Sequence, residues 1–259
     1  MSCAEFAVTA AGTGPAVVWV HGYTMDSQVW QDIWPMLPGF RHVGVDLPGH
    51  GRSGPLEPDT TLSQLADRLA EVMQRERAAR LVALSMGTMV AFELVIRRLH
   101  PVARLAVVAP ALVGMPPAVG AAERYRQLAA RRRAGASNEQ LTDLWMSAPP
   151  DIFAGIAERP DRRARLREVV LQHRWSELDF GGPAAFYRLP QRIEELPGSA
   201  EQLLVISGDR DMPEFRGLGA TLAARLPGAR LARCPQAGHL PLLEIPEHIV
   251  PLLAAFLAA

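Results

Sequence analysis

The chain has 259 residues, of which 49% are hydrophobic, so it is long enough to bury a substantial core. Its formal net charge is zero, and every basic residue is an arginine. This balance gives no electrostatic reason to expect binding to nucleic acid or to an anionic membrane surface. The composition favours one compact domain, with room for an inserted subdomain.

The two cysteines and the apolar segments also narrow the class of protein. Cys3 and Cys234 lie too far apart to suggest a disulfide framework or a zinc site, so we expect reduced thiols in a cytoplasmic protein. Residues 1–15 lack the basic stretch and long apolar run of a secretory signal. The apolar run Ala16–Val20 is far too short to span a bilayer, and residues 249–259 fit an amphipathic helix packed on the core.

Short apolar or β-branched runs alternate with helical patterns along most of the chain. In chain order, we predict an edge strand Cys3–Thr9, a strand Ala16–Val20, a helix Ser27–Met36, a strand His42–Asp46, a helix Thr61–Arg77, a strand Arg80–Leu84, a helix Met86–Leu99, a strand Arg104–Ala109, a strand Gln202–Ser207, a helix Glu214–Leu226, a strand Ala229–Cys234 and a helix Pro246–Leu257. Continuous apolar strands indicate burial on both faces. We therefore expect an α/β fold with a mostly parallel central sheet, helices on both faces and an antiparallel edge strand.

The alternation stops between residues 110 and 188. This stretch is rich in arginine, is helical in character and contains no apolar strand run. The core pattern resumes at Leu203, which favours an inserted helical lid over the alternative, a longer set of surface helices. We therefore expect a core of residues 1–109 and 189–259 and a lid of residues 110–188.

A serine lies at the junction between a predicted strand and a predicted helix. The strand Arg80–Leu84 leads directly to Ser85, and the helix begins at Met86. Ala83 and Gly87, two residues to either side of Ser85, are small, as a tight nucleophile elbow requires. Serine is also a common helix N-cap, so the junction alone is equally compatible with a cap.

Further segments resemble the alpha/beta hydrolase family, in its order and near its spacing, over nearly the whole chain. They are the strand end His21–Tyr23, the loop Asp46–Ser53, the elbow at Ser85, Gly208–Asp211 and Ala237–Glu244. The resemblance implies the alpha/beta hydrolase fold with an inserted lid. Ala83 replaces the first glycine of the common G-x-S-x-G elbow, and alanine is still small enough for the turn.

The resemblance implies a catalytic triad of Ser85, His239 and Asp211. A serine hydroxyl is a poor nucleophile until a base takes its proton, and a carboxylate holds the imidazole of that base in the required tautomer. Asp209 and Asp211 both follow a predicted strand, and the family pattern G-x-x-D, counted from Gly208, selects Asp211. We expect Asp209 to face solvent or to cap the turn.

The same resemblance implies an oxyanion hole formed by the backbone N–H groups of Tyr23 and Met86, the second at a helix N-terminus. The side chain of Tyr23 could line the site or only pack. His21, which would brace this loop, Asp46 and His50 are expected to be structural.

Apolar side chains of the expected lid are candidates for the substrate pocket: Met115, Trp145, Met146, Phe153, Trp175, Phe186 and Tyr187. Packing within the lid is the alternative explanation for more than half of them. Most lid arginines are expected on solvated helix faces, although one could hold a substrate carboxylate or phosphate. We assign no catalytic or ligand-binding motif to four other histidines, His42, His100, His173 and His248.

These features predict a serine hydrolase that cleaves a carboxylic ester, lactone or thioester of a small to medium apolar acyl group through an acyl-enzyme. The alternatives are a C–C bond hydrolase, or a lyase, cyclase, cofactor-free oxygenase or ligand-binding protein of the same fold. Residues 12–14 precede a strand and so do not form a dinucleotide loop, and Walker A and H-E-x-x-H sequences are absent. We expect a small-molecule substrate, no cofactor, no metal, no nucleic-acid partner and no membrane association; no oligomeric state is predicted.

Overall fold

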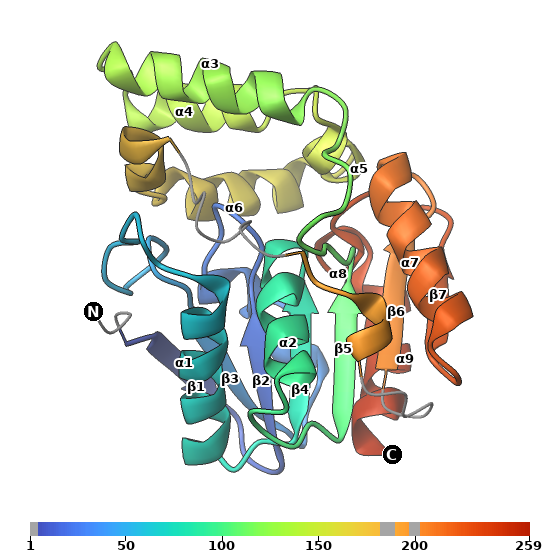
Figure 1. Ribbon diagram of the computed structural model, residues 1–259. Coiled ribbons are helices and arrows are strands. Elements are labelled where there is room, and N and C mark those ends of the chain that lie inside the picture. Colours follow the sequence, from blue (N-terminus) through green and yellow to red (C-terminus); the bar gives the residue numbers. More distant parts are fainter. Residues whose placement is uncertain (1–4, 182–189, 197–202) are drawn as a thin grey trace.

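The computed structural model describes residues 5–181, 190–196 and 203–259 (Figure 1). Its sheet has seven strands in the order β1-β3-β2-β4-β5-β6-β7. The strands are β1 (Ala7–Ala11), β2 (Ala16–Val20), β3 (Arg41–Asp46), β4 (Arg80–Leu84), β5 (Arg104–Val108), β6 (Leu203–Gly208) and β7 (Arg230–Cys234). β1 is antiparallel to β3, and all other neighbours are parallel. The predicted mostly parallel sheet with an antiparallel edge strand is confirmed.

Helices cover the sheet on both faces, which explains the continuous apolar strands. In β4, Leu81 and Ala83 belong to one buried hydrophobic cluster, whereas Val82 and Leu84 belong to the other. Alternate side chains of a strand point to opposite faces, so each cluster marks one face. One face is covered by α1 (Leu62–Arg75), α2 (Met86–Ile96) and α7 (Pro213–Arg225), and the other by α8 (Pro241–Glu244) and α9 (Pro246–Ala258). None of the helices in the described part of the chain is long and apolar enough to cross a membrane.

The predicted single helix Ser27–Met36 is wrong. The structure contains two short 3-10 helices there, η1 (Ser27–Trp30) and η2 (Trp34–Met36). A continuous α-helix would require the N–H of residue 35, which is a proline and has none. The apolar spacing that suggested a helix instead buries Trp30 and Trp34 against the sheet.

The segment between β5 and β6 contains most of the remaining helices. They are α3 (Ala121–Arg133), α4 (Asn138–Trp145), η3 (Asp151–Phe153), α5 (Ala154–Ala157), α6 (Pro160–Leu171), η4 (Ser176–Phe180) and η6 (Ile193–Glu195). Figure 1 shows α3, α4 and α6 lying beyond the carboxyl ends of the strands. Leu128, Trp145 and Leu166 of these helices share one buried cluster with Trp19 and Leu84 of the sheet. The segment therefore packs onto the sheet through a continuous apolar core.

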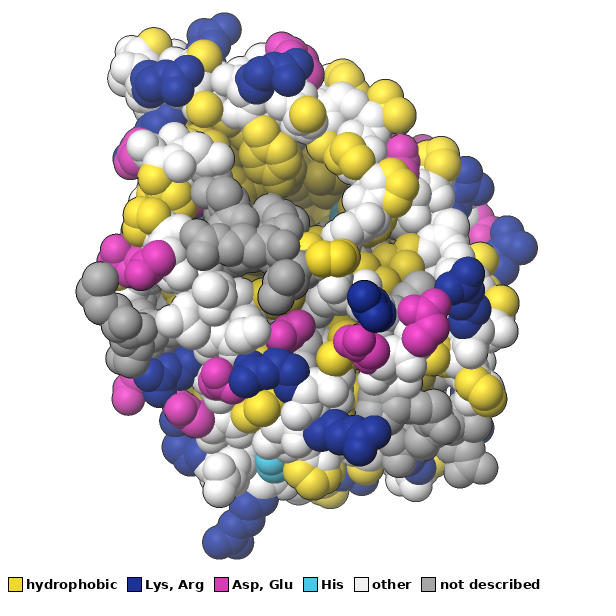
Figure 2. All heavy atoms as spheres, in the orientation of Figure 1, with side chains coloured by type: hydrophobic (Ala, Val, Ile, Leu, Met, Phe, Trp, Pro, Cys, Tyr) yellow, Lys and Arg dark blue, Asp and Glu magenta, His cyan; other side chains and the backbone are white. Residues whose placement is uncertain are grey.

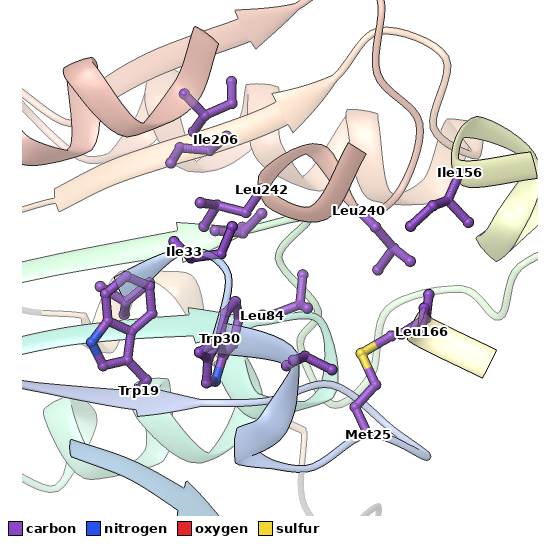
Figure 3. Close-up of a cluster of buried hydrophobic side chains, with 14 of the residues drawn as sticks. Trp19, Met25, Trp30, Ile33, Leu84, Ile156, Leu166, Ile206, Leu240 and Leu242 are labelled. Atoms are coloured by element: carbon purple, nitrogen blue, oxygen red, sulfur yellow. The ribbon is translucent and has the colours of Figure 1, made fainter. Parts of the chain in front are cut away.

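The same cluster anchors two loops at the carboxyl ends of the strands (Figure 3). Leu84 precedes Ser85 in the chain, and Leu240 follows His239. Both leucine side chains are fully buried in this cluster, together with Met25. Packing on a rigid apolar core restricts the positions that the neighbouring polar residues can take.

Cys234 is buried at the end of β7. Burial, with the nearby carboxylates Asp209 and Glu244, raises the pKa of its thiol to about 11, so the thiol is neutral at ordinary pH. Cys3 lies outside the described residues.

Candidate active site

The strand order places a crevice at the carboxyl ends of β2 and β4. From β2 the chain continues to β3 on one side, whereas from β4 it continues to β5 on the other. In open α/β sheets, ligands bind where the order reverses in this way. Residues 21–23 follow β2 and Ser85 follows β4, so both segments lie at this crevice. A Cβ atom placed on Gly22 would lie only 3.4 Å from the Cβ of Ser85.

Ser85 occupies a strained turn. Its φ is 49° and its ψ is −119°, a combination that non-glycine residues rarely adopt. Its N–H donates to the carbonyl of Val108 at 2.9 Å, and its carbonyl accepts from the hydroxyl of Thr88 at 2.6 Å. Although Ser85 stands at the N-cap position of α2, its side chain makes no capping hydrogen bond, so the interpretation as a helix cap is wrong.

Gly87 allows α2 to approach β2 closely. A Cβ atom on Gly87 would lie 2.5 Å from the carbonyl oxygen of His21 and 2.9 Å from a methyl carbon of Val20. We expect Gly87→Ala to lower the free energy of unfolding by about 2 kcal/mol, because backbone atoms on both sides would have to move. Urea denaturation measures this change.

Gly217 provides the matched control for this substitution. It lies inside α7, and nothing lies within 4 Å of the position its Cβ would take. Gly217→Ala should leave the protein equally stable or more stable, by up to about 1 kcal/mol, because alanine favours helix. Equal destabilisation by both substitutions would contradict the role of Gly87 as a contact point.

His239 joins Ser85 to Asp211. Its Nε2 lies 2.9 Å from Ser85 Oγ, and its Nδ1 lies 3.0 Å from each carboxylate oxygen of Asp211. His239 is only 1% exposed, and the ring of Phe215 packs edge-on against its imidazole, with the ring centres 4.4 Å apart. Asp211 Oδ1 also accepts the N–H of Met212 at 2.7 Å, which fixes the carboxylate. The structure therefore brings the three side chains predicted as a triad into one chain of hydrogen bonds.

Asp209 lies apart from this chain. Its carboxylate pairs with Arg233 at 2.8 Å, and 26% of its side chain is exposed. Asp209 and Asp211 follow the same strand, so the turn that begins at Gly208 directs one carboxylate to the surface and the other to His239.

Glu244 braces the loop that carries His239. Its buried carboxylate accepts the N–H of Gly238 at 2.6 Å and the N–H of Leu240 at 3.0 Å, on either side of the histidine. Burial raises the pKa of this carboxyl, and the two backbone bonds act against that rise. The sequence does not reveal this role, because the two donors are backbone atoms whose directions depend on the loop.

Within the described ranges, no three His, Cys, Asp or Glu side chains are grouped as metal ligands.

The two predicted oxyanion-hole residues flank Ser85 in different ways. Met86 is the first residue of α2, where helical N–H groups have no acceptor within the helix. Tyr23 follows Gly22 beside Ser85, and its side chain is half-buried, with the hydroxyl donating to Glu177. The sequence identified neither Glu177 nor this bond.

The candidate pocket residues separate into two groups. Trp145, Met146, Phe153 and Trp175 are buried in the cluster that joins the helical segment to the sheet. Met115 is partly buried and packs on the cluster of the opposite face. Phe186 and Tyr187 lie outside the described residues. Figure 2 shows a hollow beneath the α3 and α4 helices that is lined by hydrophobic side chains.

Buried histidines surround the loop after β2. His21 Nε2 accepts the N–H of Leu47 at 3.0 Å, and its Nδ1 lies 2.8 Å from the carbonyl of Gly22, so His21 braces this loop as predicted. Burial lowers the pKa of His21 and His42. Burial also holds the pKa of His50 well below its usual value, and the neighbouring His173 and His21 lower it further.

These lowered pKa values predict that acid destabilises the fold. Below about pH 6.5 the unfolded chain protonates these histidines more fully than the folded protein does, so the unfolded state binds more protons. The free energy of unfolding should therefore fall by up to about 1.4 kcal/mol per pH unit for each such histidine. Glu244, whose pKa is raised, acts in the opposite direction, but it is one group against three. Urea denaturation between pH 7.5 and pH 5.5 measures the slope.

His50→Gln should make this slope shallower, because it removes a histidine whose pKa is held well below its usual value by burial and by two neighbouring histidines. The control is His248→Gln, at an exposed position on α9. Identical slopes in the two variants would show that His50 does not contribute to the pH dependence.

Comparison with known proteins relates the whole chain to one family. A sequence profile of the alpha/beta hydrolase family matches residues 17–250. The chain is 31% identical to a pimeloyl-[acyl-carrier protein] methyl ester esterase of Aromatoleum aromaticum, over 92% of this chain and 96% of that protein. It is 29% identical to the protein of the same name from Methylococcus capsulatus, over 97% and 98% of the two chains. The structure resembles a thermophilic esterase of Thermogutta terrifontis, with a TM-score of 0.79, 25% identity, and 98% and 93% of the two chains covered.

Proposed function

Because the chain belongs to the alpha/beta hydrolase family, we propose that it is a serine hydrolase of carboxylic esters, lactones or thioesters with small to medium apolar acyl groups. One observation carries the proposal: Ser85, on a strained elbow, lies in a continuous chain of hydrogen bonds with His239 and Asp211. The names of the esterase relatives favour a carboxylic ester as the first substrate to test.

The acylation step uses the two faces of the His239 imidazole. Nδ1–H donates to Asp211, so Nε2 carries the lone pair that receives the Ser85 hydroxyl proton. Ser85 Oγ forms a bond to the substrate carbonyl carbon, and the carbonyl electron pair moves to its oxygen. When the tetrahedral intermediate collapses, His239 gives the proton to the leaving alcohol, and the acyl group stays on Ser85.

Deacylation repeats this chemistry with water. His239 takes a proton from water as the oxygen attacks the acyl carbon, and it returns the proton to Ser85 Oγ as the acid leaves. In both steps the negative oxygen would be stabilised by the N–H groups of Tyr23 and Met86, the second supported by the dipole of α2. The strained elbow supports the role of Ser85 as the nucleophile, because it keeps Ser85 Oγ clear of the α2 backbone.

The helices of residues 110–188 would serve as a lid over this site. The apolar hollow beneath α3 and α4 supports a substrate with an apolar acyl group (Figure 2). Trp145, Met146, Phe153 and Trp175 belong to this segment, and as buried core residues they would form the packed apolar wall behind such a pocket.

The test is an activity profile with a covalent probe. We expect a fluorophosphonate to label Ser85, identified by mass spectrometry, and the enzyme to hydrolyse members of a panel of methyl esters, aryl esters, thioesters and lactones of graded acyl length. Ser85→Ala is the control in both assays. A folded wild-type protein that is neither labelled nor active on the panel would contradict the proposal and favour a non-hydrolytic role.

A further inference from the structure

Two residues of the helical segment bond to the loop that follows β2. Tyr23 donates its hydroxyl hydrogen to the carboxylate of Glu177 in η4. The indole N–H of Trp145, the last residue of α4, donates to the hydroxyl of Thr24 at 2.8 Å. The Thr24 hydroxyl in turn donates to the carbonyl of Tyr23 at 2.6 Å. Consecutive residues of the loop are thus held by two separate elements of the segment.

The backbone of this loop needs such support. Thr24 has a φ of 63°, in the left-handed region that β-branched residues avoid. A residue in this conformation persists only where its surroundings hold it there. Thr24 is 1% exposed. Its hydroxyl accepts from Trp145 and donates to the carbonyl of Tyr23, and these two bonds fix the side chain.

Glu177 is held in place as firmly as the loop. It is 2% exposed, and His173 Nε2 lies 3.1 Å from the oxygen that accepts from Tyr23. Burial raises the pKa of the Glu177 carboxyl. His173, through one hydrogen bond and its charge, and the hydrogen bond from Tyr23 act against this rise and bring the pKa below its usual value. The carboxylate is therefore ionised at neutral pH and is a strong acceptor for the Tyr23 hydroxyl.

Aromatic packing closes the arrangement around Tyr23. Its ring meets the rings of Trp145 and His173 edge-on, at centre distances of 5.3 Å and 5.5 Å. The ring of His50 also lies edge-on at 6.0 Å. Edge-to-face contacts of this kind favour one ring orientation over others.

We propose that Glu177 and Trp145 are positioning residues that hold the Tyr23 backbone N–H for the reaction, so that docking of the helical segment completes the oxyanion hole. The inference rests on the proposed function, because it needs an oxyanion at Ser85. Neither residue touches the reacting atoms; each acts through residues 23 and 24.

The test compares Glu177→Ala with Asp179→Ala, a control on the same 3-10 helix, where Asp179 forms an exposed pair with Arg132. Removing an oxyanion donor outright lowers kcat by about 100- to 1000-fold, so loss of its positioning should lower kcat by roughly 10- to 100-fold with KM nearly unchanged. Asp179→Ala should stay within about twofold of wild type. Glu177→Gln, whose amide oxygen can still accept from Tyr23, should restore most of the lost activity.

A second readout separates positioning from stability. Affinity for a trifluoromethyl ketone, which forms an oxyanion on Ser85, should fall with kcat in Glu177→Ala and in Trp145→Phe, whereas affinity for the product acid should not. Tyr23→Phe removes the same hydrogen bond from its donor side, so the double variant Tyr23→Phe/Glu177→Ala should be no slower than Glu177→Ala alone.

The outcomes distinguish this inference from the function on which it rests. If wild type is active, depends on Ser85, and keeps its kcat within about twofold in Glu177→Ala, Trp145→Phe and Tyr23→Phe, only the positioning roles are overturned. The same holds if the variants lose thermal stability but the folded protein binds the ketone normally. If Ser85→Ala retains full activity, the proposed function fails, and the inference fails with it.

Discussion

Ser85→Ala is expected to lower kcat for ester hydrolysis by roughly 10⁴- to 10⁶-fold, leaving only the residual catalysis of binding and the oxyanion hole. The reason is geometric: Ser85 Oγ is the atom 2.9 Å from His239 Nε2, and alanine has no oxygen to attack the substrate. KM should change little, because the hydroxyl contributes chiefly to the transition state. Steady-state kinetics on the best ester of the panel measure both constants.

The geometry of the elbow predicts that Ser85→Ala loses activity without losing stability. Ser85 makes no side-chain capping bond to α2, so removing its oxygen should not weaken the helix start. Thermal unfolding of Ser85→Ala should therefore match wild type within a few degrees. Retained activity in a folded, probe-resistant variant would show that another residue is the nucleophile.

Asp211→Asn should lower kcat by about 10⁴-fold while the protein remains folded. Asparagine keeps the shape of aspartate, but its amide nitrogen can face His239 Nδ1 and favour the wrong imidazole tautomer. The neutral amide also cannot stabilise the imidazolium that forms as Ser85 attacks. Steady-state kinetics and thermal unfolding, measured on the same preparation, separate the loss of rate from any loss of structure.

Asp209→Asn is the matched control, because it makes the same chemical change two residues earlier. Asp209 pairs with Arg233 at the surface, and such pairs contribute little to stability. Its activity should stay within about twofold of wild type. If Asp209→Asn were the slower variant, the assignment of the acid would have to be reversed.

The fold was largely predictable because the strands are buried on both faces. Runs such as Val17–Val20 are continuous apolar segments. Small residues lie two positions to either side of Ser85, where a strand leads into a helix. The predicted strand positions are confirmed to within a few residues. His239 lies within hydrogen-bond distance of both Ser85 and Asp211, as the ordered motifs suggested.

Interactions between distant segments could not be predicted in the same way. Glu177 looks like any acidic residue of a helical stretch until η4 brings it to Tyr23, which precedes it by 154 residues. Residues 27–36 have the apolar spacing of one helix, but Pro35 and the contact with the sheet leave two short 3-10 helices, η1 and η2. Such features depend on the assembled molecule and not on local propensity.

The distribution of the site along the chain has a consequence for biosynthesis. The elbow, with β2 and β4, is complete early in translation, whereas His239 is 154 residues further on, in the loop that follows β7. A nascent chain that ends before residue 239 therefore has no base beside Ser85. Hydrolytic activity would appear only when β6 and β7 have joined the sheet, so activity would report that folding is finished.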